Sequence, residues 1–133
     1  NDNSTVDYFT GATNLGDILA EQGYNQEFLL GSDSTFAGRK SFFEQHGNYD
    51  VKDYYSAIDN GWIDKDYLAW WGYEDEKLYA FARSEMKRLA QKGEPFNLTL
   101  LTADTHFTDD CCPSIWNLHT VHVFKHRKSG QGF

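Results

Sequence analysis

Hydrophobic periodicity along the chain predicts three helices. In residues 14–22, Asn14 stands as an N-cap before an apolar face, and a glycine follows the segment. A second helix is predicted over residues 36–46, with two adjacent phenylalanines on one face and a glycine at its end. The longest covers residues 74–92, where apolar residues recur at helical spacing between an acidic first turn and a basic last turn.

Short apolar runs between these helices predict strands. Residues 24–30 end in a Phe-Leu-Leu run before a glycine, and residues 96–102, directly after Pro95, are predicted as a second strand. Residues 51–55 are predicted as a short strand, and residues 56–72 as an ordered loop with one helical turn. Helices that alternate with strands predict an α/β fold, in which right-handed crossovers build a parallel sheet covered by helices.

Composition narrows the class of protein. A length of 133 residues with 40% hydrophobic content is typical of one soluble globular domain. No apolar run approaches the ~20 residues of a membrane-spanning helix, and no segment resembles a signal peptide. The net charge of −8 disfavours nucleic acid as a partner, because it would repel a phosphate backbone. The chain begins with Asn1 rather than Met, so we expect it to be part of a longer protein.

Charge divides the chain at the Cys111-Cys112-Pro113 step. Residues 113–133 carry three basic side chains and no acidic one, which leaves 9 basic and 20 acidic residues in residues 1–112. We therefore predict a main domain over residues 1–112 and a separate basic C-terminal tail over residues 113–133. The two cysteines indicate no disulfide framework, because a bond between adjacent cysteines strains the intervening peptide.

Two polar loops carry the candidate chemistry. In open α/β sheets, ligands bind beyond the carboxyl ends of the strands, where residues 31–39 and 103–110 are predicted to lie. If the two strands are parallel neighbours, Arg39 and His106 converge at one edge of the sheet. A guanidinium binds two oxygens of a phosphate or sulfate, and a histidine donates a hydrogen bond or exchanges a proton there. The simpler alternatives, a surface ion pair for Arg39 and a structural loop hydrogen bond for His106, stay open.

The tryptophans allow two interpretations. Trp62, Trp70 and Trp71 could stack on sugar rings, which would make the chain a non-catalytic glycan-binding or interaction module. We favour the interpretation that they cover a core or pack against the rest of the domain. In that case the isolated chain would expose an aromatic surface and self-associate.

The histidines of the tail also allow two interpretations. His119, His122 and His126 would share one face of a helix, a pattern that suits zinc, copper or nickel. Residues 120–124 are nevertheless more typical of a strand, which would place His119 and His122 on opposite faces. We favour a structural role for these residues.

Residues 10–110 resemble the lipoteichoic acid synthase and phosphoglycerol transferase family, within the sulfatase-like branch of the alkaline phosphatase superfamily. The resemblance rests on GATNLGDIL at residues 11–19, GSD at 31–33, FAGR at 36–39, YEDEKL at 73–78 and PFNLTLLTADTHF at 95–107. It implies that residues 1–112 form a partial sulfatase-like catalytic domain, with part of an alkaline-phosphatase-like sheet.

The resemblance implies a function and site residues. Members of the family are membrane-anchored bacterial enzymes that face outward from the cytoplasmic membrane. They transfer phosphoglycerol from a lipid through a threonine, with a divalent metal that is commonly manganese. Arg39 matches the arginine that contacts the substrate phosphate, and His106 matches a second substrate-contacting residue. Ser32 and Asp33 are further candidates because they share the loop of Arg39. The tryptophan that the family's synthases often carry near Ala37 is absent.

The resemblance also implies that catalytic parts lie outside this chain. Thr10, Thr13 and Thr35 do not match the family's nucleophile motif, and no segment matches its metal-binding acid or its Asp-His pair. We therefore expect a fragment that contacts phosphate or sulfate esters in cell-envelope polymer synthesis and is inactive without the remainder of the catalytic domain. The tail departs from the family after Pro113, through either a disrupted reading frame or a genuine divergent end.

Overall fold

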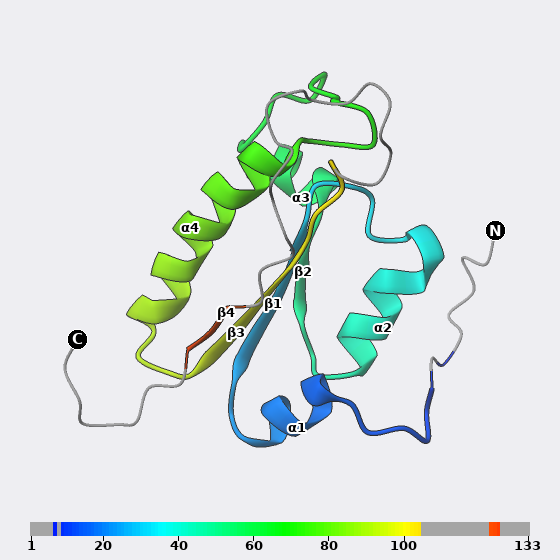
Figure 1. Cartoon of the computed structure of the whole chain (residues 1–133), viewed down its shortest axis with the longest axis vertical. Helices are drawn as coiled ribbons and strands as arrows, with labels where there is room; N and C mark the ends of the chain where they lie inside the picture. Colours follow the sequence, from blue (N-terminus) through cyan, green and yellow to red (C-terminus); the bar gives the residue numbers. More distant parts are fainter. Residues whose placement is uncertain (1–6, 8, 105–122, 126–133) are drawn as a thin grey trace.

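The computed structural model describes residues 7, 9–104 and 123–125. Figure 1 shows helices packed around a central sheet. The elements in chain order are α1 (Leu15–Glu21), β1 (Asn25–Leu30), the 3₁₀ turn η1 (Phe36–Gly38), α2 (Arg39–Gln45), β2 (Asp50–Lys52), α3 (Tyr54–Asp59), α4 (Asp75–Gln91), β3 (Phe96–Leu101) and β4 (Val123–Lys125).

The sheet has the strand order β2-β1-β3-β4. β1 is parallel to both β2 and β3, and its last residue, Leu30, pairs with Leu101 at the end of β3. β4 runs antiparallel to β3. The predicted α/β fold with alternating helices and parallel strands is confirmed for β1, β2 and β3, and the antiparallel β4 adds to it.

Alternate residues of β1 point into two hydrophobic clusters, one on each face of the sheet. Leu29 packs with residues of α3, α4 and β3, among them Leu78 and Leu98. Phe28 and Leu30 pack on the other face, where the Phe28 ring stacks on Phe43 of α2 with 3.9 Å between centroids. Side chains of a strand point alternately to the two faces, so the continuous apolar run of β1 is explained by helices on both sides.

The predicted strand over residues 51–55 is wrong for its last three residues. β2 ends at Lys52 because Asp53 caps α3, with its carboxylate accepting a hydrogen bond from the Ser56 N–H at 3.0 Å. The helical turn predicted within residues 56–72 therefore begins earlier, at Tyr54. The helix predicted over residues 36–46 is interrupted at Ala37, whose φ of 55° is left-handed, and continues as α2 from Arg39.

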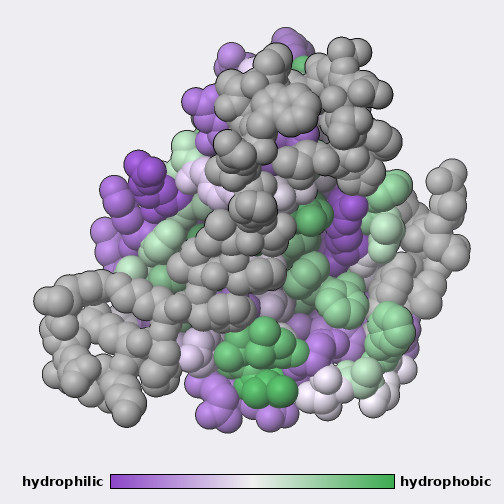
Figure 2. Space-filling model, in the orientation of Figure 1, coloured by the Kyte–Doolittle hydropathy of each residue, from purple (hydrophilic) through white to green (hydrophobic). Residues whose placement is uncertain are grey.

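The helix predicted over residues 14–22 is confirmed, but its apolar face is only partly covered. Leu15 and Ile18 of α1 remain 53% and 49% exposed. Figure 2 shows hydrophobic surface over α1, at the lower end of the molecule in this view. None of the helices in the described part of the chain is both long and apolar enough to cross a bilayer.

The tryptophans separate into two environments. Trp62 packs against the core beside Phe81, with 5.0 Å between ring centroids, as the packing interpretation predicts. Trp70 and Trp71 stack on each other at 4.7 Å and remain 41% and 44% exposed. Nothing in this arrangement supports a glycan-binding module.

The tail lies largely outside the described residues. β4 agrees with the strand interpretation of residues 120–124 at two positions, Val123 and Phe124. The domain boundary between residues 1–112 and 113–133 stays a prediction. Cys111, Cys112, His119, His122 and His126 lie outside the described residues.

Candidate functional site

The carboxyl ends of β1 and β3 lie side by side. Because Leu30 pairs with Leu101, residues 31–39 and 102–104 leave the sheet at the same edge, at the top of Figure 1. This is the strand arrangement that the predicted site requires. His106 lies outside the described residues, so its predicted role stays a prediction.

A buried aspartate holds the loop after β1. The Ser34 N–H and hydroxyl donate to one carboxylate oxygen of Asp53 at 3.1 and 2.6 Å. The other oxygen accepts from the N–H and hydroxyl of Ser56 at 3.0 and 3.1 Å. Burial by itself raises the pKa of Asp53, but these hydrogen bonds outweigh it and hold the pKa below its ordinary value. Asp53 therefore remains ionised while it joins the loop to α3.

Arg39 is the first residue of α2 and is half-buried. Its guanidinium carbon lies 5.0 Å from the centroid of the Phe36 ring, and no acidic side chain among the described residues forms an ion pair with it. Its neighbour Lys40, by contrast, pairs with Glu44 at 3.9 Å. Among the described residues, Arg39 is thus a cation without an anionic partner, as a phosphate contact would be.

One backbone amide at the start of α2 is already occupied. The Lys40 N–H donates to the Ser34 carbonyl at 2.8 Å, and α2 has seven residues. The Lys40 N–H is therefore not available to an anion beside Arg39.

Ser32 and Asp33 both shape the loop. One carboxylate oxygen of Asp33 accepts from the N–H and hydroxyl of Thr35, each at 2.8 Å, which closes a turn. The Ser32 carbonyl accepts from the Tyr54 N–H at 3.3 Å, and the Ser32 backbone also bridges to Gly72. Their predicted contact with substrate stays a prediction.

A second buried aspartate holds the end of β3. The carboxylate of Asp75 accepts from the Ala103 N–H at 3.0 Å and from the Asp104 N–H at 3.2 Å. The Asp104 carboxylate in turn accepts from the Asp75 N–H at 3.0 Å. Burial raises the pKa of Asp104, the Asp75 N–H lowers it, and the nearby carboxylates of Asp75 and Glu74 raise it further, so the balance is an elevated pKa. These reciprocal hydrogen bonds fix residues 103 and 104, which lead along the chain to His106, a predicted substrate contact.

Asp53 and Asp75, the aspartates that hold the loops after β1 and β3, were not predicted as site residues. Asp53 was placed within a strand, and Asp75 was interpreted as a charge favourable to the start of its helix. A signal for Asp53 was present, because an aspartate followed three residues later by a polar hydroxyl is compatible with a helix start. No local pattern links Asp75 to residues 103–104.

The turn over residues 69–72, which contains Trp70 and Trp71, packs onto the same edge. The Tyr73 N–H donates to the Gly31 carbonyl at 2.9 Å, and a small recess lies between Ser32, Trp70, Trp71 and Asp104. A Cβ on Gly72 would lie 1.7 Å from the Gly31 carbonyl oxygen, so only glycine permits this approach.

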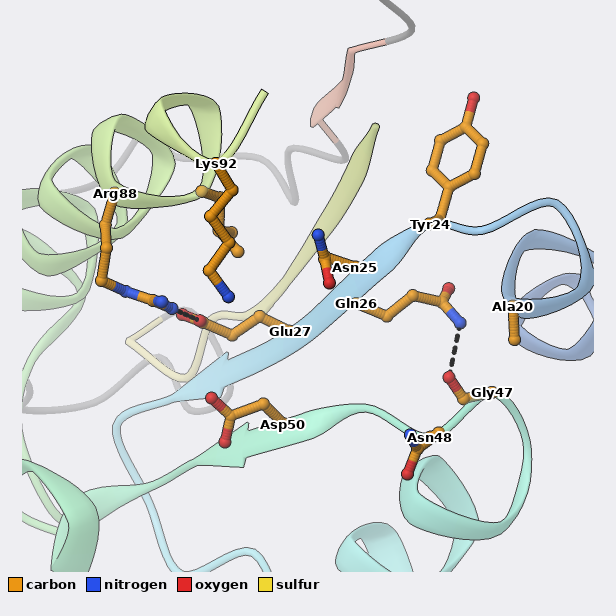
Figure 3. Close-up of a pocket in the computed structure, with 11 residues that line it drawn as sticks. Ala20, Tyr24, Asn25, Gln26, Glu27, Gly47, Asn48, Asp50, Arg88 and Lys92 are labelled. Carbon is orange, nitrogen blue, oxygen red and sulfur yellow. Dashed lines mark hydrogen bonds and ion pairs between the residues drawn. The ribbon is translucent and has the colours of Figure 1, made fainter. Parts of the chain in front are cut away.

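A larger recess, of about 240 Å³, lies at the amino ends of the strands (Figure 3). Its lining includes Glu27 of β1 and Arg88 of α4, joined by an ion pair at 2.6 Å. Lys52 of β2 lies 3.3 Å from Glu27 and 2.7 Å from Glu85. Of the predicted site residues that the structure describes, Ser32, Asp33 and Arg39 do not line this recess.

The four charges of Glu27, Lys52, Glu85 and Arg88 are tightly coupled. Burial, together with the hydrogen bond to Glu85, raises the pKa of Glu27 to about 7. Burial opposes ionisation of Glu85 as well, but hydrogen bonds from Arg88 and Lys52 outweigh it and lower its pKa to about 2. The cluster therefore joins β1, β2 and α4 through neutralised charge.

The described residues offer no ligand set for a divalent metal. Within residues 7, 9–104 and 123–125, no three His, Cys, Asp or Glu side chains converge in a way that could hold a metal ion. The acidic side chains at the carboxyl edge accept hydrogen bonds from the backbone and from hydroxyls. These residues by themselves do not fit the manganese that the resemblance implies.

Comparison with known proteins identifies the family. The family model described as Sulfatase matches residues 3–116. The chain belongs to the sulfatase family. This sulfatase-family chain is 41% identical over 92 residues to phosphoglycerol transferase I of Xanthomonas campestris pv. campestris strain B100. It is 32% identical over 109 residues to phosphoglycerol transferase I of Escherichia coli O139:H28 strain E24377A.

These relatives are much longer than the chain. The two matches cover 69% and 80% of this sulfatase-family chain, but 13% and 14% of the relatives. A crystal structure of a protein in the alkaline phosphatase superfamily from Vibrio parahaemolyticus matches with a TM-score of 0.61 and 27% identity, over 84% of this chain and 27% of that one. The resemblance to a sulfatase-like part of this superfamily is confirmed, and enzymes of the superfamily generally use a divalent metal.

Proposed function

We propose that this chain supplies the substrate-phosphate contacts of a metal-dependent phosphoglycerol transferase or related hydrolase that acts on phosphate or sulfate esters in cell-envelope polymer synthesis. The observation that carries the proposal is Arg39. It lies at the edge where ligands bind in such sheets, without an anionic partner among the described residues. The relatives named phosphoglycerol transferase I favour a phosphate ester as the anion.

The chemistry assigned to this chain is binding and orientation. The Arg39 guanidinium donates two parallel hydrogen bonds to oxygens of the phosphate, and His106 donates a third from the loop after β3. Ser32, at the same edge, offers a hydroxyl. These contacts hold the phosphorus for in-line attack by a threonine that the rest of the catalytic domain provides.

The remaining partners belong to the same proposal. The divalent metal, manganese in the family that the chain resembles, would neutralise charge on the phosphate from ligands outside the described residues. The substrate is a phosphoglycerol-bearing lipid or a similar ester, met at the outer face of the bacterial cytoplasmic membrane. The chain alone is expected to be catalytically inactive and to depend on the remainder of the catalytic domain.

The test is a titration of the chain with glycerol phosphate, followed by NMR, for three proteins. Arg39→Ala should weaken binding at least about tenfold, because it removes charge-assisted hydrogen bonds. Lys40→Ala is the matched control, since this neighbouring cation already pairs with Glu44. Its affinity should stay within about twofold of the unmodified chain. Equal effects of the two substitutions, or no effect of Arg39→Ala, would overturn the proposal.

A further inference from the structure

We infer that Asp53 is a positioning residue for Arg39, an inference that rests on the proposed function. Asp53 does not touch the phosphate. It sets the place of the guanidinium by holding Ser34, five residues before Arg39 along the loop.

A continuous path of hydrogen bonds links Asp53 to the start of α2. The Asp53 carboxylate accepts from both the N–H and the hydroxyl of Ser34, at 3.1 and 2.6 Å. The Ser34 carbonyl accepts from the Lys40 N–H at 2.8 Å. Lys40 directly follows Arg39 in the first turn of α2. A displacement of Ser34 therefore moves the backbone from which the guanidinium projects.

Asp53 is itself fixed in place. Its other carboxylate oxygen caps α3 through the N–H and hydroxyl of Ser56. The next residue, Tyr54, donates its N–H to the Ser32 carbonyl at 3.3 Å. The loop is thus fastened to the start of α3 at Ser32 and Ser34, and α3 is anchored in the core through the fully buried Ala57.

The backbone between Ser34 and Arg39 depends on its surroundings. Ala37 and Gly38 both have left-handed conformations, with φ of 55° and 70°. Such a conformation at a non-glycine residue is unfavourable and persists where surrounding contacts hold it. Ser34 is 1% exposed and lies on one side of this turn, so its bond to Asp53 is one such contact.

The geometry excludes a direct role for Asp53. It is 8% exposed, and its carboxylate accepts four hydrogen bonds from Ser34 and Ser56. An ionised carboxylate would also repel a phosphate. Any effect of Asp53 on phosphate binding therefore passes through Ser34.

The experiment measures glycerol phosphate affinity in Asp53→Asn, with and without Arg39→Ala. Asparagine keeps the shape but has a single accepting oxygen, so the bonds to Ser34 or to Ser56 must break. We expect Asp53→Asn to weaken binding about tenfold when Arg39 is present and less than about twofold when Arg39 is alanine. The Arg39 Nε–Hε resonance at saturating glycerol phosphate should also differ from that of the unmodified chain.

A matched control lies at the other end of the molecule. Asp17 also accepts from a backbone N–H, that of Asn14 at 3.0 Å, and contacts His46 at 3.1 Å. Asp17→Asn should lower stability while leaving phosphate affinity and the Arg39 resonance unchanged. If Asp53→Asn does not fold, Ser34→Ala replaces it. Ser34→Ala removes only the hydroxyl bond, and about a threefold weakening is expected.

The outcomes separate the two proposals. If Arg39→Ala itself leaves binding unchanged, or the chain does not bind glycerol phosphate, the proposed function fails and the inference fails with it. If Arg39→Ala weakens binding but Asp53→Asn weakens it equally in both backgrounds, or not at all, the positioning role alone is overturned. A weakening by Asp53→Asn or Ser34→Ala that requires Arg39 supports it.

Discussion

Two regions of the molecule use buried acidic residues in opposite ways. At the carboxyl edge of the sheet, Asp53 and Asp75 accept hydrogen bonds from backbone N–H groups and hydroxyls of the loops. Between the sheet and α4, Glu27 and Glu85 are bound by the cationic side chains of Lys52 and Arg88, and Figure 3 shows the Glu27–Arg88 pair. The first arrangement uses no cationic side chain.

The difference separates loop ordering from the joining of elements. Neutral donors stabilise an ionised carboxylate without occupying a cationic side chain, whereas an ion pair neutralises both of its members. Within the described part of the chain, the charged cluster thus holds β1, β2 and α4 together, and the two aspartates at the carboxyl edge order the loops that follow β1 and β3.

The largest expected effect comes from breaking the charged cluster of Glu27, Lys52, Glu85 and Arg88. Lys52→Met leaves Glu27 and Glu85 buried with one cation fewer, and should cost about 3 kcal/mol in the free energy of unfolding. Lys40→Met, at an exposed pair, should change it by less than about 0.5 kcal/mol. Urea denaturation of both variants provides the measurement. A loss below about 1 kcal/mol for Lys52→Met would show that the cluster does not hold the scaffold.

The next effect belongs to the carboxyl edge. In Asp75→Asn, the amide side chain has one accepting oxygen and cannot accept equally well from both the Ala103 and Asp104 N–H groups. The substitution should lower the free energy of unfolding by about 2 kcal/mol. Amide hydrogen exchange at these two positions should accelerate more than elsewhere in the sheet. The control is Glu76→Gln, an exposed acid in the same helical turn. Equal rates of amide hydrogen exchange in the two variants would show that Asp75 does not hold the end of β3.

The charged cluster and the carboxyl edge should respond oppositely to pH. Because the folded pKa of Glu27 is raised to about 7 from 4.5, its contribution to stability is present below pH 4.5 and is lost as the pH rises towards 7. Because the pKa of Asp53 is lowered from 3.8, its contribution is present above pH 3.8 and is lost at more acidic pH. Stability between about pH 5 and 8 should therefore fall on the order of 1 kcal/mol, and Glu27→Gln should flatten that fall. A fall of the same size in Glu27→Gln would assign it to another group.

The smallest effect concerns the left-handed turn before Arg39. Ala37→Gly removes the cost of a positive φ and should stabilise the chain by about 0.5 kcal/mol. Ala20→Gly, in an exposed helical position of α1, should instead destabilise it by about 1 kcal/mol. Thermal melts of both variants test the sign. Destabilisation by Ala37→Gly would mean that the alanine methyl makes a contact needed by the loop.

Much of this fold was predictable from periodicity. The apolar stripe of α4, the apolar residues 28–30 of β1 and the recurring leucines of β3 predicted these elements with bounds that differ from the structure by one residue at most. β2 was placed less well. It has three residues, and the capping bonds of Asp53 turn the chain directly after it into α3.

The candidate site was predictable in part. The strand ends were expected to meet, and Arg39 was expected at the edge where they do so. The hydrogen bond between Asp53 and Ser34 joins residues 19 positions apart, and those from Ala103 and Asp104 to Asp75 join residues 28 and 29 positions apart. No local sequence pattern predicts such distant partners. The segment around Trp70 and Trp71 was predicted as part of a loop. Its close approach to Gly31 depends on the missing side chain of Gly72, and the sequence alone does not show which residue Gly72 approaches.

The most direct test is a map of amide shifts on addition of glycerol phosphate to the unmodified chain. We predict shifts in residues 31–40 and 102–104, with none at the amino-end recess lined by Gly47, Asn48 and Lys92. Shifts centred on that recess would contradict the proposed site, because the phosphate would then bind at the amino ends of the strands and not at their carboxyl ends.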